Sequence, residues 1–193
     1  MKYFALTQNF TAEMAHYCRL SIPSKLPEGV WWDVWAFTKC SPAKAPPYPF
    51  FVRKQGIELE VNFVPPWEIP VMSRRVAELV QKIAPSDVER IPVEITDVSG
   101  EWQILNVLTC IDCIDHSASH IDYYPAEMMP WEDQTKAGKP RGVRRLVING
   151  DSVGNHHVFR PRDWTVTLVV SEQIRAALTD ASIEGIRFIE VSQ

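Results

Sequence analysis

The chain carries the same local pattern twice, and this duplication constrains its fold more than any other feature of the sequence. The first copy runs from Val71 to Val93 and the second from Val169 to Phe188. In each copy a serine precedes an amphipathic stretch of helical period, and a short polar turn then leads to an alternating apolar stretch. With a strand before the serine, each copy would be a small β-α-β unit, right-handed if its strands are parallel. A chance likeness between two helix-then-strand segments is the alternative, and the sequence alone leaves both open.

Two short helices are predicted within these copies. Ser73 and Ser171 are expected to cap them, because a serine hydroxyl can accept a hydrogen bond from the free amides of the first helical turn. Pro85 is expected to end the first helix, since proline lacks an amide hydrogen and clashes with the preceding turn. The predicted buried stripes consist of Val76, Leu79, Val80 and Ile83 in the first helix and of Ile174, Ala177 and Leu178 in the second.

The remaining strand-like segments do not alternate strictly with helices. This mixture favours an α+β fold with a mixed, largely antiparallel sheet, two or more short helices and, if the duplication is real, an internal β-α-β pseudo-repeat. Period-two alternation predicts that residues 50–53 and 57–63 form a hairpin. Residues 102–114 are almost continuously apolar, which predicts one central strand, and a long loop is expected over residues 116–142.

The length of the chain suits a single domain. A chain of 193 residues with 46% hydrophobic content can bury a full core, so we expect one domain over residues 1–193. Residues 1–65 open with a predicted strand at residues 2–6 and continue through irregular stretches rich in aromatic residues and proline. A separate N-terminal lobe over residues 1–65 is therefore the alternative.

Charge and cysteine content argue against several classes of protein. A net charge of −4 and an isoelectric point near 5.7 argue against a general nucleic-acid binder. The first residues do not form a basic, then apolar signal peptide, and no apolar run approaches the roughly 20 residues of a membrane span. Four cysteines are too few for a disulfide framework at this length. We therefore expect a reduced, cytoplasmic protein that binds neither nucleic acid nor a membrane.

One cluster has the composition of a metal site. Cys110, Cys113, His116 and His120 offer thiolate and imidazole ligands of the kind that zinc binds in tetrahedral geometry. The two cysteines lie three positions apart in a predicted strand, where their side chains would point to opposite faces, and the spacing to the histidines is compressed. Two core thiols and two loop histidines are the favoured interpretation, so we expect no metal and no cofactor. A small zinc-dependent enzyme that uses this cluster is the alternative function.

Other candidate catalytic residues have weak support. His156 and His157 are adjacent, so on a strand at most one of them can face a given site. Ser152 lies between two glycines, but its spacing differs from that of a nucleophile elbow. The sequence contains no phosphate-binding glycine loop, kinase signature or helical pair of metalloprotease histidines. We therefore expect a protein that is not an enzyme.

The charge distribution is uneven in the middle of the chain. From Ile91 to Thr135 there are nine acidic residues and no lysine or arginine, and five basic residues then follow between Lys136 and Arg145. The predicted loop combines acidic residues with aromatics and methionines, which is typical of protein-binding surfaces, where apolar groups supply affinity and charges steer the partner. The candidate contact residues are Asp112, Asp115, Asp122, Tyr123, Tyr124, Glu127, Trp131, Glu132 and Asp133.

Two interpretations of this acidic loop are open. Loops of this length in compact domains are often functional, and an acidic loop would suit a basic partner such as a nuclease-type domain whose groove it occupies. The alternative is a solvated loop that the adjacent basic residues neutralise, with Trp131 packed into the core.

Short motifs across the greater part of the chain carry a family resemblance. The similarity lies in Leu146–Asp151, His157–Arg160, Val169–Ile174 and Gly185–Phe188, and upstream in Ser73, Ile91–Ile95, Leu105–Leu108, Asp112 and Asp115. It covers residues 66–191 and points to the eleventh immunity family of polymorphic toxin systems, a myxobacterial type formerly described as a domain of unknown function. The shared motifs are strand and helix-cap patterns and not catalytic signatures.

This resemblance implies a function in competition between bacteria. Members of the family are expected to neutralise a cognate toxin by binding it directly, and in this chain an acidic surface would block the active site of the toxin. The family has no agreed catalytic residues, so none is carried over. The family pattern has aliphatic residues where this chain has Cys110 and Cys113, which argues further against a zinc site.

Overall fold

The computed structural model describes residues 1–9, 18–22, 28–29, 31–65 and 68–192. Its α-helices are α1 (Arg74–Ile83) and α2 (Glu172–Asp180), and its 3-10 helices are η2 (Val34–Thr38), η3 (Gln134–Lys136) and η4 (Gly150–Val153). The strands are β1 (Tyr3–Gln8), β2 (Arg19–Ser21), β3 (Phe51–Lys54), β4 (Val61–Val64), β5 (Ile69–Ser73), β6 (Val88–Val93), β7 (Trp102–Val107), β8 (Cys110–Ile111), β9 (His120–Tyr123), β10 (Pro140–Arg145), β11 (Val158–Pro161), β12 (Leu168–Ser171) and β13 (Ile186–Glu190). Within these described ranges, no helix is long and apolar enough to cross a membrane.

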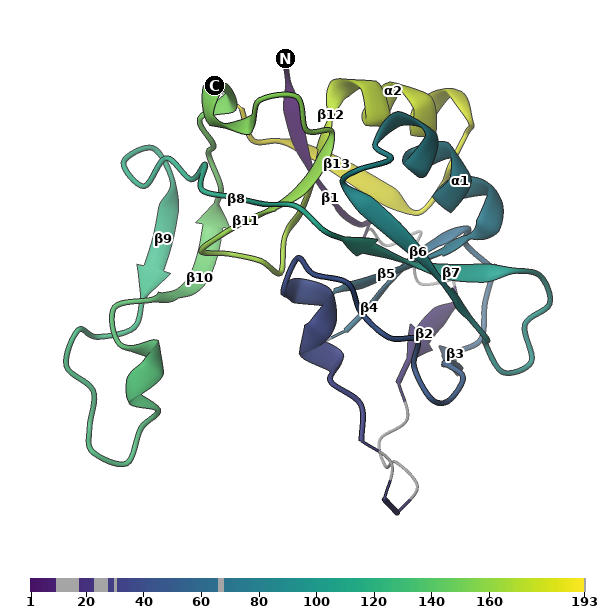
Figure 1. The fold of residues 1–193 in the computed structure, drawn as a ribbon, viewed down its shortest axis with the longest axis horizontal. Coiled ribbons are helices and arrows are strands. Elements are labelled where there is room, and N and C mark those ends of the chain that lie inside the picture. The colour runs from purple at the N-terminus through teal and green to yellow at the C-terminus, as the bar shows by residue number, and fades with distance from the viewer. Residues whose placement is uncertain (10–17, 23–27, 30, 66–67, 193) are drawn as a thin grey trace.

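Most of the strands belong to two sheets (Figure 1). One sheet has the strand order β4-β5-β7-β6, and the other has the order β13-β1-β12-β11-β8. Neighbouring strands in both sheets are antiparallel, except that β11 and β8 are parallel. Strands β2 and β3 pair with each other, and so do β9 and β10. The predicted α+β fold, with mostly antiparallel sheets and short helices, is confirmed.

The two copies of the sequence pattern fold into units of the same topology. In the first unit β5 and β6 are both antiparallel to β7, which lies between them, so they run parallel to each other. In the second unit β12 and β13 are likewise parallel, with β1 between them. Strand β4 flanks β5 as β11 flanks β12. The series β4, β5, α1, β6, β7 thus corresponds to β11, β12, α2, β13, β1, and the N-terminal strand takes the position that β7 has in the first unit.

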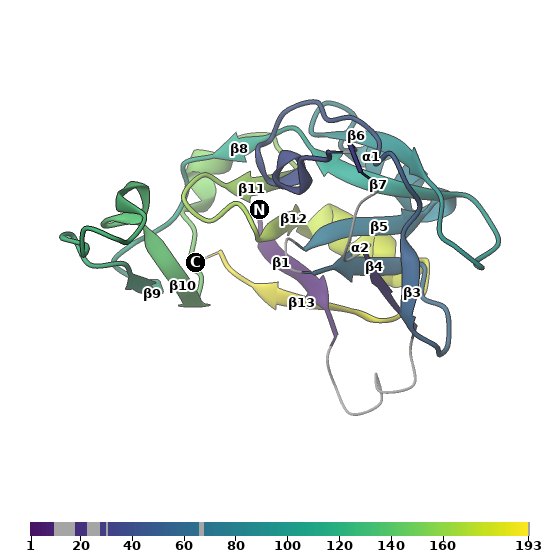
Figure 2. The ribbon, with the colours of Figure 1, turned by 90° about the horizontal axis from the view of Figure 1, so that it is seen from below.

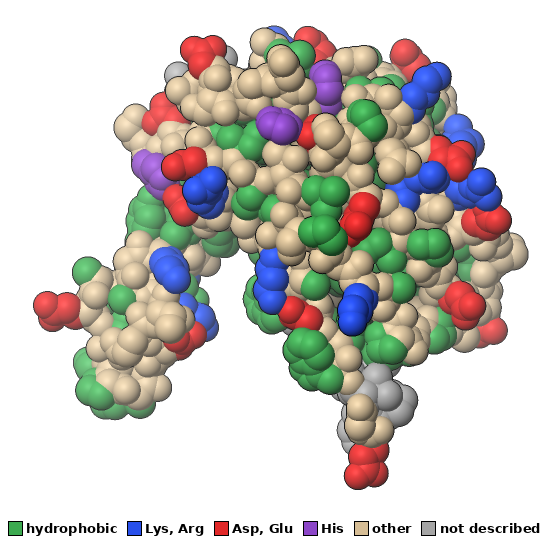
Figure 3. Space-filling model, viewed as in Figure 1, with side chains coloured by type: hydrophobic (Ala, Val, Ile, Leu, Met, Phe, Trp, Pro, Cys, Tyr) green, Lys and Arg blue, Asp and Glu red, His purple; other side chains and the backbone are tan. Residues whose placement is uncertain are grey.

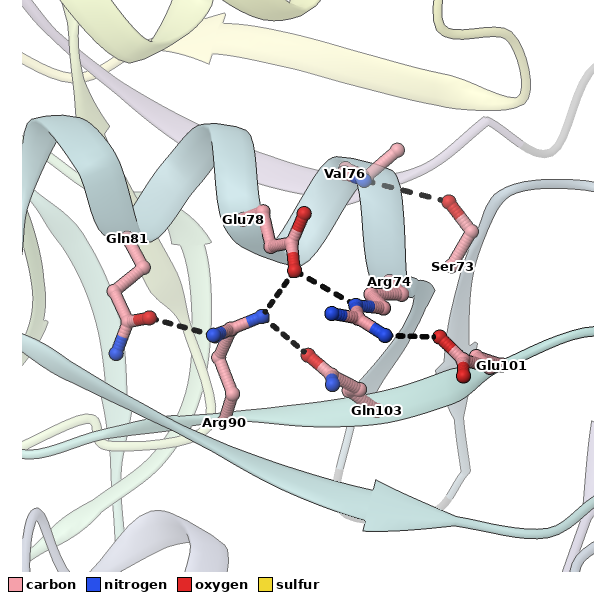
Figure 4. Close-up of polar contacts among 8 residues, drawn as sticks. All are labelled: Ser73, Arg74, Val76, Glu78, Gln81, Arg90, Glu101 and Gln103. Atoms are coloured by element: carbon pink, nitrogen blue, oxygen red, sulfur yellow. Dashed lines mark hydrogen bonds and ion pairs between the residues drawn. The ribbon is translucent and has the colours of Figure 1, made fainter.

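Equivalent serines cap the two helices, as the sequence predicts. The Oγ of Ser73 accepts a hydrogen bond from the amide of Val76 at 3.4 Å (Figure 4), and the Oγ of Ser171 accepts from the amide of Ile174 at 3.4 Å. Each serine is also the last residue of its strand. Its hydroxyl satisfies one of the amides that have no partner within the helix, so strand and helix join without an intervening loop.

The surroundings of these serines are equivalent as well. The amide of Ser73 donates to the carbonyl of Glu60 at 2.8 Å, and the amide of Ser171 donates to the carbonyl of His157 at 2.9 Å. Glu60 immediately precedes β4 and His157 immediately precedes β11. The side chains of both residues also lie 2.9 Å from the hydroxyl of the serine that they face. The duplication is therefore structural, and it extends to individual hydrogen bonds.

The two helices bury their apolar stripes in one core that both sheets share. Val76 and Val80 of α1, and Ile174 and Leu178 of α2, are at most 2% exposed within a cluster that also draws on β1, β4, β5, β7, β11 and β12. Helices α1 and α2 contact each other and lie side by side in Figure 1. Full burial of one such side chain stabilises the folded state by roughly 1.5–3 kcal/mol, so this shared core is a major source of stability.

Polar contacts hold α1 against β6 and the loop before β7 (Figure 4). Arg90 of β6 donates to Glu78 Oε1 at 3.1 Å and to Gln81 Oε1 at 2.6 Å, and both acceptors extend from α1 toward this strand. Arg74 in the first turn of α1 donates to Glu78 Oε1 at 2.7 Å and to Glu101 Oε2 at 2.6 Å. These side chains are largely exposed, so the network orients the helix more than it stabilises the fold.

Two strand predictions are wrong. Residues 102–114 do not form one strand, because β7 ends at Val107 and the chain then crosses to the second sheet as β8. The continuous apolar pattern arises because this segment passes from one core to the next. The hairpin of residues 50–53 and 57–63 does not form either, since β3 pairs with β2 and β4 pairs with β5.

The first residues of the chain are built into the second sheet. Strand β1 pairs with β12 on one side and with β13 on the other, and Phe4 and Leu6 enter the shared core. This arrangement supports the proposal that the chain is a single domain, in which residues 1–65 do not form a separate lobe.

Replacing a buried side chain of β1 tests whether this strand contributes to the core. Phe4 is 2% exposed, so Phe4→Ala should lower the free energy of unfolding by about 3–4 kcal/mol, measured by urea denaturation. Trp31→Ala is the matched aromatic control, because Trp31 is 80% exposed and its loss should change stability by no more than about 0.5 kcal/mol. Equal, small effects of the two substitutions would contradict a central structural role for β1.

Candidate functional site

Residues 120–145 form a hairpin that projects from the body of the protein, and we call this segment the hairpin arm. Its strands β9 and β10 pair with each other and with no other described strand. Figures 1 and 2 both show the arm extending away from the two sheets. The sequence predicts a long loop over residues 116–142, and the structure corrects this, because part of the segment pairs with itself as a β-ribbon.

Local hydrogen bonds order the tip of the arm without help from the body. Asp133 accepts from the amide of Thr135 at 3.1 Å and from its hydroxyl at 2.6 Å, which caps η3. The amide of Met129 donates to Glu132 Oε2 at 2.8 Å, and the side-chain amide of Gln134 donates to the carbonyl of Met129 at 2.7 Å. The tip can therefore present its side chains in a defined arrangement.

The arm exposes large apolar side chains. Trp131 is 81% exposed, Met129 is 56% exposed and Tyr123 is 45% exposed. Figure 3 shows hydrophobic side chains gathered at the far end of the arm. The alternative in which Trp131 packs into the core is therefore wrong. Exposed tryptophan on a projecting, ordered element is typical of a binding surface, because burying it against a partner removes a large apolar area from water.

Charges on the arm are partly paired. The Nε of Arg144 lies 3.0 Å from Asp122 Oδ2, and the Nζ of Lys136 lies 3.6 Å from Asp133 Oδ2, so basic residues neutralise two of the acids as the alternative interpretation expects. Hydrogen bonds from the hydroxyl and amide of Thr135 hold the pKa of Asp133 below its ordinary value. Within the described part of the chain, Glu127 is exposed and forms no ion pair, so the acidic character concentrates toward the tip.

The nine predicted contact residues fall into two groups. Six of them are exposed on the arm, namely Asp122, Tyr123, Glu127, Trp131, Glu132 and Asp133. Tyr124 is half-buried, and the guanidinium carbon of Arg141 lies 5.8 Å from the centroid of the Tyr124 ring. Asp112 and Asp115 lie instead at the root of the arm.

Asp115 has a structural role at that root. Its Oδ1 accepts from the amide of Ser117 at 2.9 Å, from its hydroxyl at 2.6 Å and from the amide of Ala118 at 3.0 Å. These hydrogen bonds shape the turn that leads into the arm and hold the pKa of Asp115 below its ordinary value. Asp115 is thus occupied within the chain, whereas Asp112 is exposed.

His116 connects this root to β9 and to the loop after β11, which sequence reasoning missed. Its Nδ1 lies 2.9 Å from the hydroxyl of Tyr123, and its Nε2 lies 3.7 Å from Asp163 Oδ2. Tyr123 is only seven positions from His116, but Asp163 comes from a segment far along the chain, so no local pattern indicates the contact with Asp163.

The four residues of the alternative zinc cluster do not converge. Cys113 is buried in a small core with Tyr3 and Phe159, and Cys110 lies beside Cys40. Among the residues that the structure describes, no three histidine, cysteine or acidic side chains are placed to hold a metal ion. The alternative of a zinc enzyme that uses these four residues has no assembled site.

The adjacent histidines face different partners, as expected. His156 Nδ1 lies 2.7 Å from Asp87 Oδ1, and His157 Nδ1 lies 2.9 Å from the Oγ of Ser171. The amides of His157 and Val158 donate to Asp87 Oδ2 at 2.8 and 3.1 Å. Burial raises the pKa of Asp87, but these hydrogen bonds together hold it below its ordinary value. The carboxylate fastens the turn before β6 to the start of β11, so it links the two units.

A model of a known protein family matches most of the chain. The family model described as "Immunity protein family (Imm11)" matches residues 44–193, a range that holds the whole hairpin arm and both repeated units apart from β1. The sequence resemblance is expected to start at residue 66, whereas the family match already starts at residue 44. Pro66 itself lies outside the described residues. No curated protein matches the chain.

Removal of the Asp87 charge tests its linking role. Asp87→Asn should lower the free energy of unfolding at pH 7 by about 2 kcal/mol, because four donors, the hydroxyl of Thr109 among them, lose a charged acceptor that is 3% exposed. The pKa of Asp87 in the folded state lies below its ordinary value of 3.8, so its contribution is present above that pH and is lost as the pH falls through the folded pKa.

Urea denaturation across a pH series gives the measurement. The difference between wild type and Asp87→Asn should be largest above about pH 5 and should shrink toward about pH 3. Asp97→Asn, at an exposed position whose positive φ of 61° asparagine also tolerates, is the control and should show no such difference. A difference for Asp87→Asn that does not vary with pH would rule out the charge as its source.

Proposed function

We propose a function from one premise, which is that this chain belongs to the immunity protein family Imm11. Membership assigns it an immunity function and implies a toxin as its partner. In our proposal the chain neutralises its cognate toxin by direct binding and not by catalysis, and the hairpin arm forms part of the contact surface. The cell compartment in which both proteins meet would then be the cytoplasm, where the free thiols remain reduced.

The exposed apolar side chains of the arm are the observation that carries this proposal. Trp131 and Met129 stand on a hairpin that contributes to none of the three buried clusters, so packing of the fold does not explain their exposure. Tryptophan is enriched among the residues that dominate binding energy at interfaces. The ordered tip lowers the entropy lost on binding, because its backbone is already held by its own hydrogen bonds.

Charge suggests which kind of toxin surface the tip would meet. Residues 122–133 contain four acids and no base, whereas residues 136–145 contain five bases and no acid. The arm is therefore not acidic as a whole, and the acidic surface is confined to its leading half. We propose that this half faces a basic surface of the toxin, such as the groove of a nuclease-type domain, and thereby blocks the active site.

Truncation of the tip tryptophan tests the contact surface. With the toxin domain encoded by the neighbouring gene, Trp131→Ala should raise the Kd at least about 30-fold and reduce protection on co-expression. The melting temperature should stay unchanged, because Trp131 is 81% exposed. Trp31→Ala is a matched control, since Trp31 is 80% exposed but lies outside the arm. Tight toxin binding that survives Trp131→Ala, or that both substitutions weaken equally, would exclude the arm tip as the contact.

Reversal of one acidic charge tests the electrostatic part. Glu127→Lys should slow association with the toxin about tenfold at low salt, with the difference shrinking as salt is added. Glu184→Lys, at an exposed position in the loop between α2 and β13, provides the same charge change outside the arm and should have little effect. Surface plasmon resonance at several salt concentrations would measure both, and faster association of Glu127→Lys would show that the toxin surface is not basic.

A further inference from the structure

Two of the four free cysteines lie together in the fold although 70 positions separate them in the sequence. Cys40 follows η2 in the N-terminal part of the chain, and Cys110 opens β8 in the second sheet. The Cys40 and Cys110 side chains lie close enough to interact. The residue after Cys40 is anchored near the end of β7, where the carbonyl of Ser41 accepts from Asn106 Nδ2 at 2.8 Å. The sequence pattern groups Cys110 with Cys113, but the partner that the fold provides is Cys40.

A buried arginine lies next to this pair. Arg160 on β11 is the direct register partner of Cys110 on β8, and its side chain is fully buried. Its Nη1 donates to the carbonyls of Thr165 and Val166 at 2.8 and 3.2 Å. Its Nε and Nη2 are buried and have no hydrogen-bond partner among the described residues. The carboxyl group of Glu68 and the sulfurs of Cys40 and Cys110 all lie near enough to interact with this charge. Because an uncompensated buried charge is costly, Arg160 favours a negative charge on these neighbours.

Cys110 is the sulfur best placed to carry that negative charge. The hydrogen bond from Cys40, together with the charges of Arg162 and Arg160, lowers the pKa of Cys110 to about 7. Burial raises the pKa of Cys113 to about 12, and it also raises that of Cys18. The lowered pKa favours the thiolate form of Cys110, which is the form of cysteine that reacts with oxidants.

Solvent exposure and backbone conformation also distinguish Cys40 and Cys110 from the other two cysteines. Cys40 and Cys110 are both half-exposed, whereas Cys18 and Cys113 are buried. Cys40 has a positive φ of 52°, a conformation that non-glycine residues seldom adopt and that the surrounding structure must hold in place. The fold thus holds two cysteine side chains next to each other, both partly exposed to small molecules from solvent.

We propose that Cys40 and Cys110 form a redox-modification site that hydrogen peroxide converts into a disulfide. The Cys110 thiolate attacks one peroxide oxygen, so an S–O bond forms, the O–O bond breaks and hydroxide leaves, which gives a sulfenic acid. Cys40 then attacks the Cys110 sulfur, and its proton leaves with the sulfenic oxygen as water. The two sulfurs together lose two electrons to the peroxide, and solvent protonates the first hydroxide to a second water. A thiol reductant reverses the modification.

The disulfide would join distant parts of the fold. It would tie the segment after η2 to β8 and close a loop of about 70 residues in the unfolded chain, which should raise the melting temperature by roughly 5–10 °C. Because β8 leads directly into the root of the hairpin arm, the link would also restrain the base of that arm.

Oxidation of the purified full chain, without any toxin, tests this inference. One equivalent of hydrogen peroxide should lower the intact mass by about 2 Da and leave two of the four thiols titratable, and peptide mass spectrometry should find Cys40 linked to Cys110. The Cys18→Ser and Cys113→Ser variants should form the same link, whereas Cys40→Ser and Cys110→Ser should not. Four reduced thiols after treatment, over-oxidation of Cys110 without a link, or a link to another cysteine would each overturn the proposal.

Two exposed neighbours test the electrostatic activation of Cys110 without disturbing the core. The positive charge of Arg162 favours the Cys110 thiolate and the negative charge of Asp163 opposes it. Arg162→Ala should slow formation of the link a few-fold, and Asp163→Asn should accelerate it by a similar factor. If Arg162→Ala accelerated link formation and Asp163→Asn slowed it, or if both changed the rate in the same direction, the thiolate would not be the reacting form.

Discussion

The fold depends on one shared core between two sheets, into which both helices insert. Each β-α-β unit presents an apolar helix stripe that its own strands cover only in part. The contact between α1 and α2, and the residues that both sheets contribute to a single cluster, complete the burial. Because apolar burial is the main favourable term in folding, neither unit has a sufficient core without the other.

The second β-α-β unit, at the C-terminal end of the chain, obtains its central strand from the N-terminal end. In the first unit the central strand β7 follows β6 in the sequence, whereas in the second unit the equivalent strand is β1. The amide of Arg74 donates to the carbonyl of Glu101 at 2.8 Å, and the amide of Glu172 donates to the carbonyl of Lys2 at 2.9 Å, so even the entry to each helix is matched. Asp87 then links the two units through a buried carboxylate. The hairpin arm leaves the second sheet after β8 and takes no part in this scaffold, which frees its side chains for a partner.

Local chemistry explains which predictions from the sequence succeeded. A serine before a helical apolar stripe suffices to place Ser73 and Ser171 as caps, and the alternating apolar stretch that ends the first copy suffices to indicate β6. The errors arose where a local pattern has two tertiary solutions. Residues 102–114 are apolar because they cross two cores in succession, and the alternating residues of 57–63 pair with β5 instead of β3. The pairing of β9 with β10 was missed because these strands lie far from both sheets and carry little apolar alternation.

The sequence by itself determined the fold class, the two capped helices, the family resemblance and the candidate contact residues of the acidic loop, because each depends on residues close together in the chain. Only the tertiary structure decided that Trp131 is exposed on a projecting arm, that β1 completes the second unit and that Cys110 meets Cys40 and not Cys113. Those features join segments tens of residues apart. Their contacts follow from which apolar faces are buried together, and no local spacing encodes that choice.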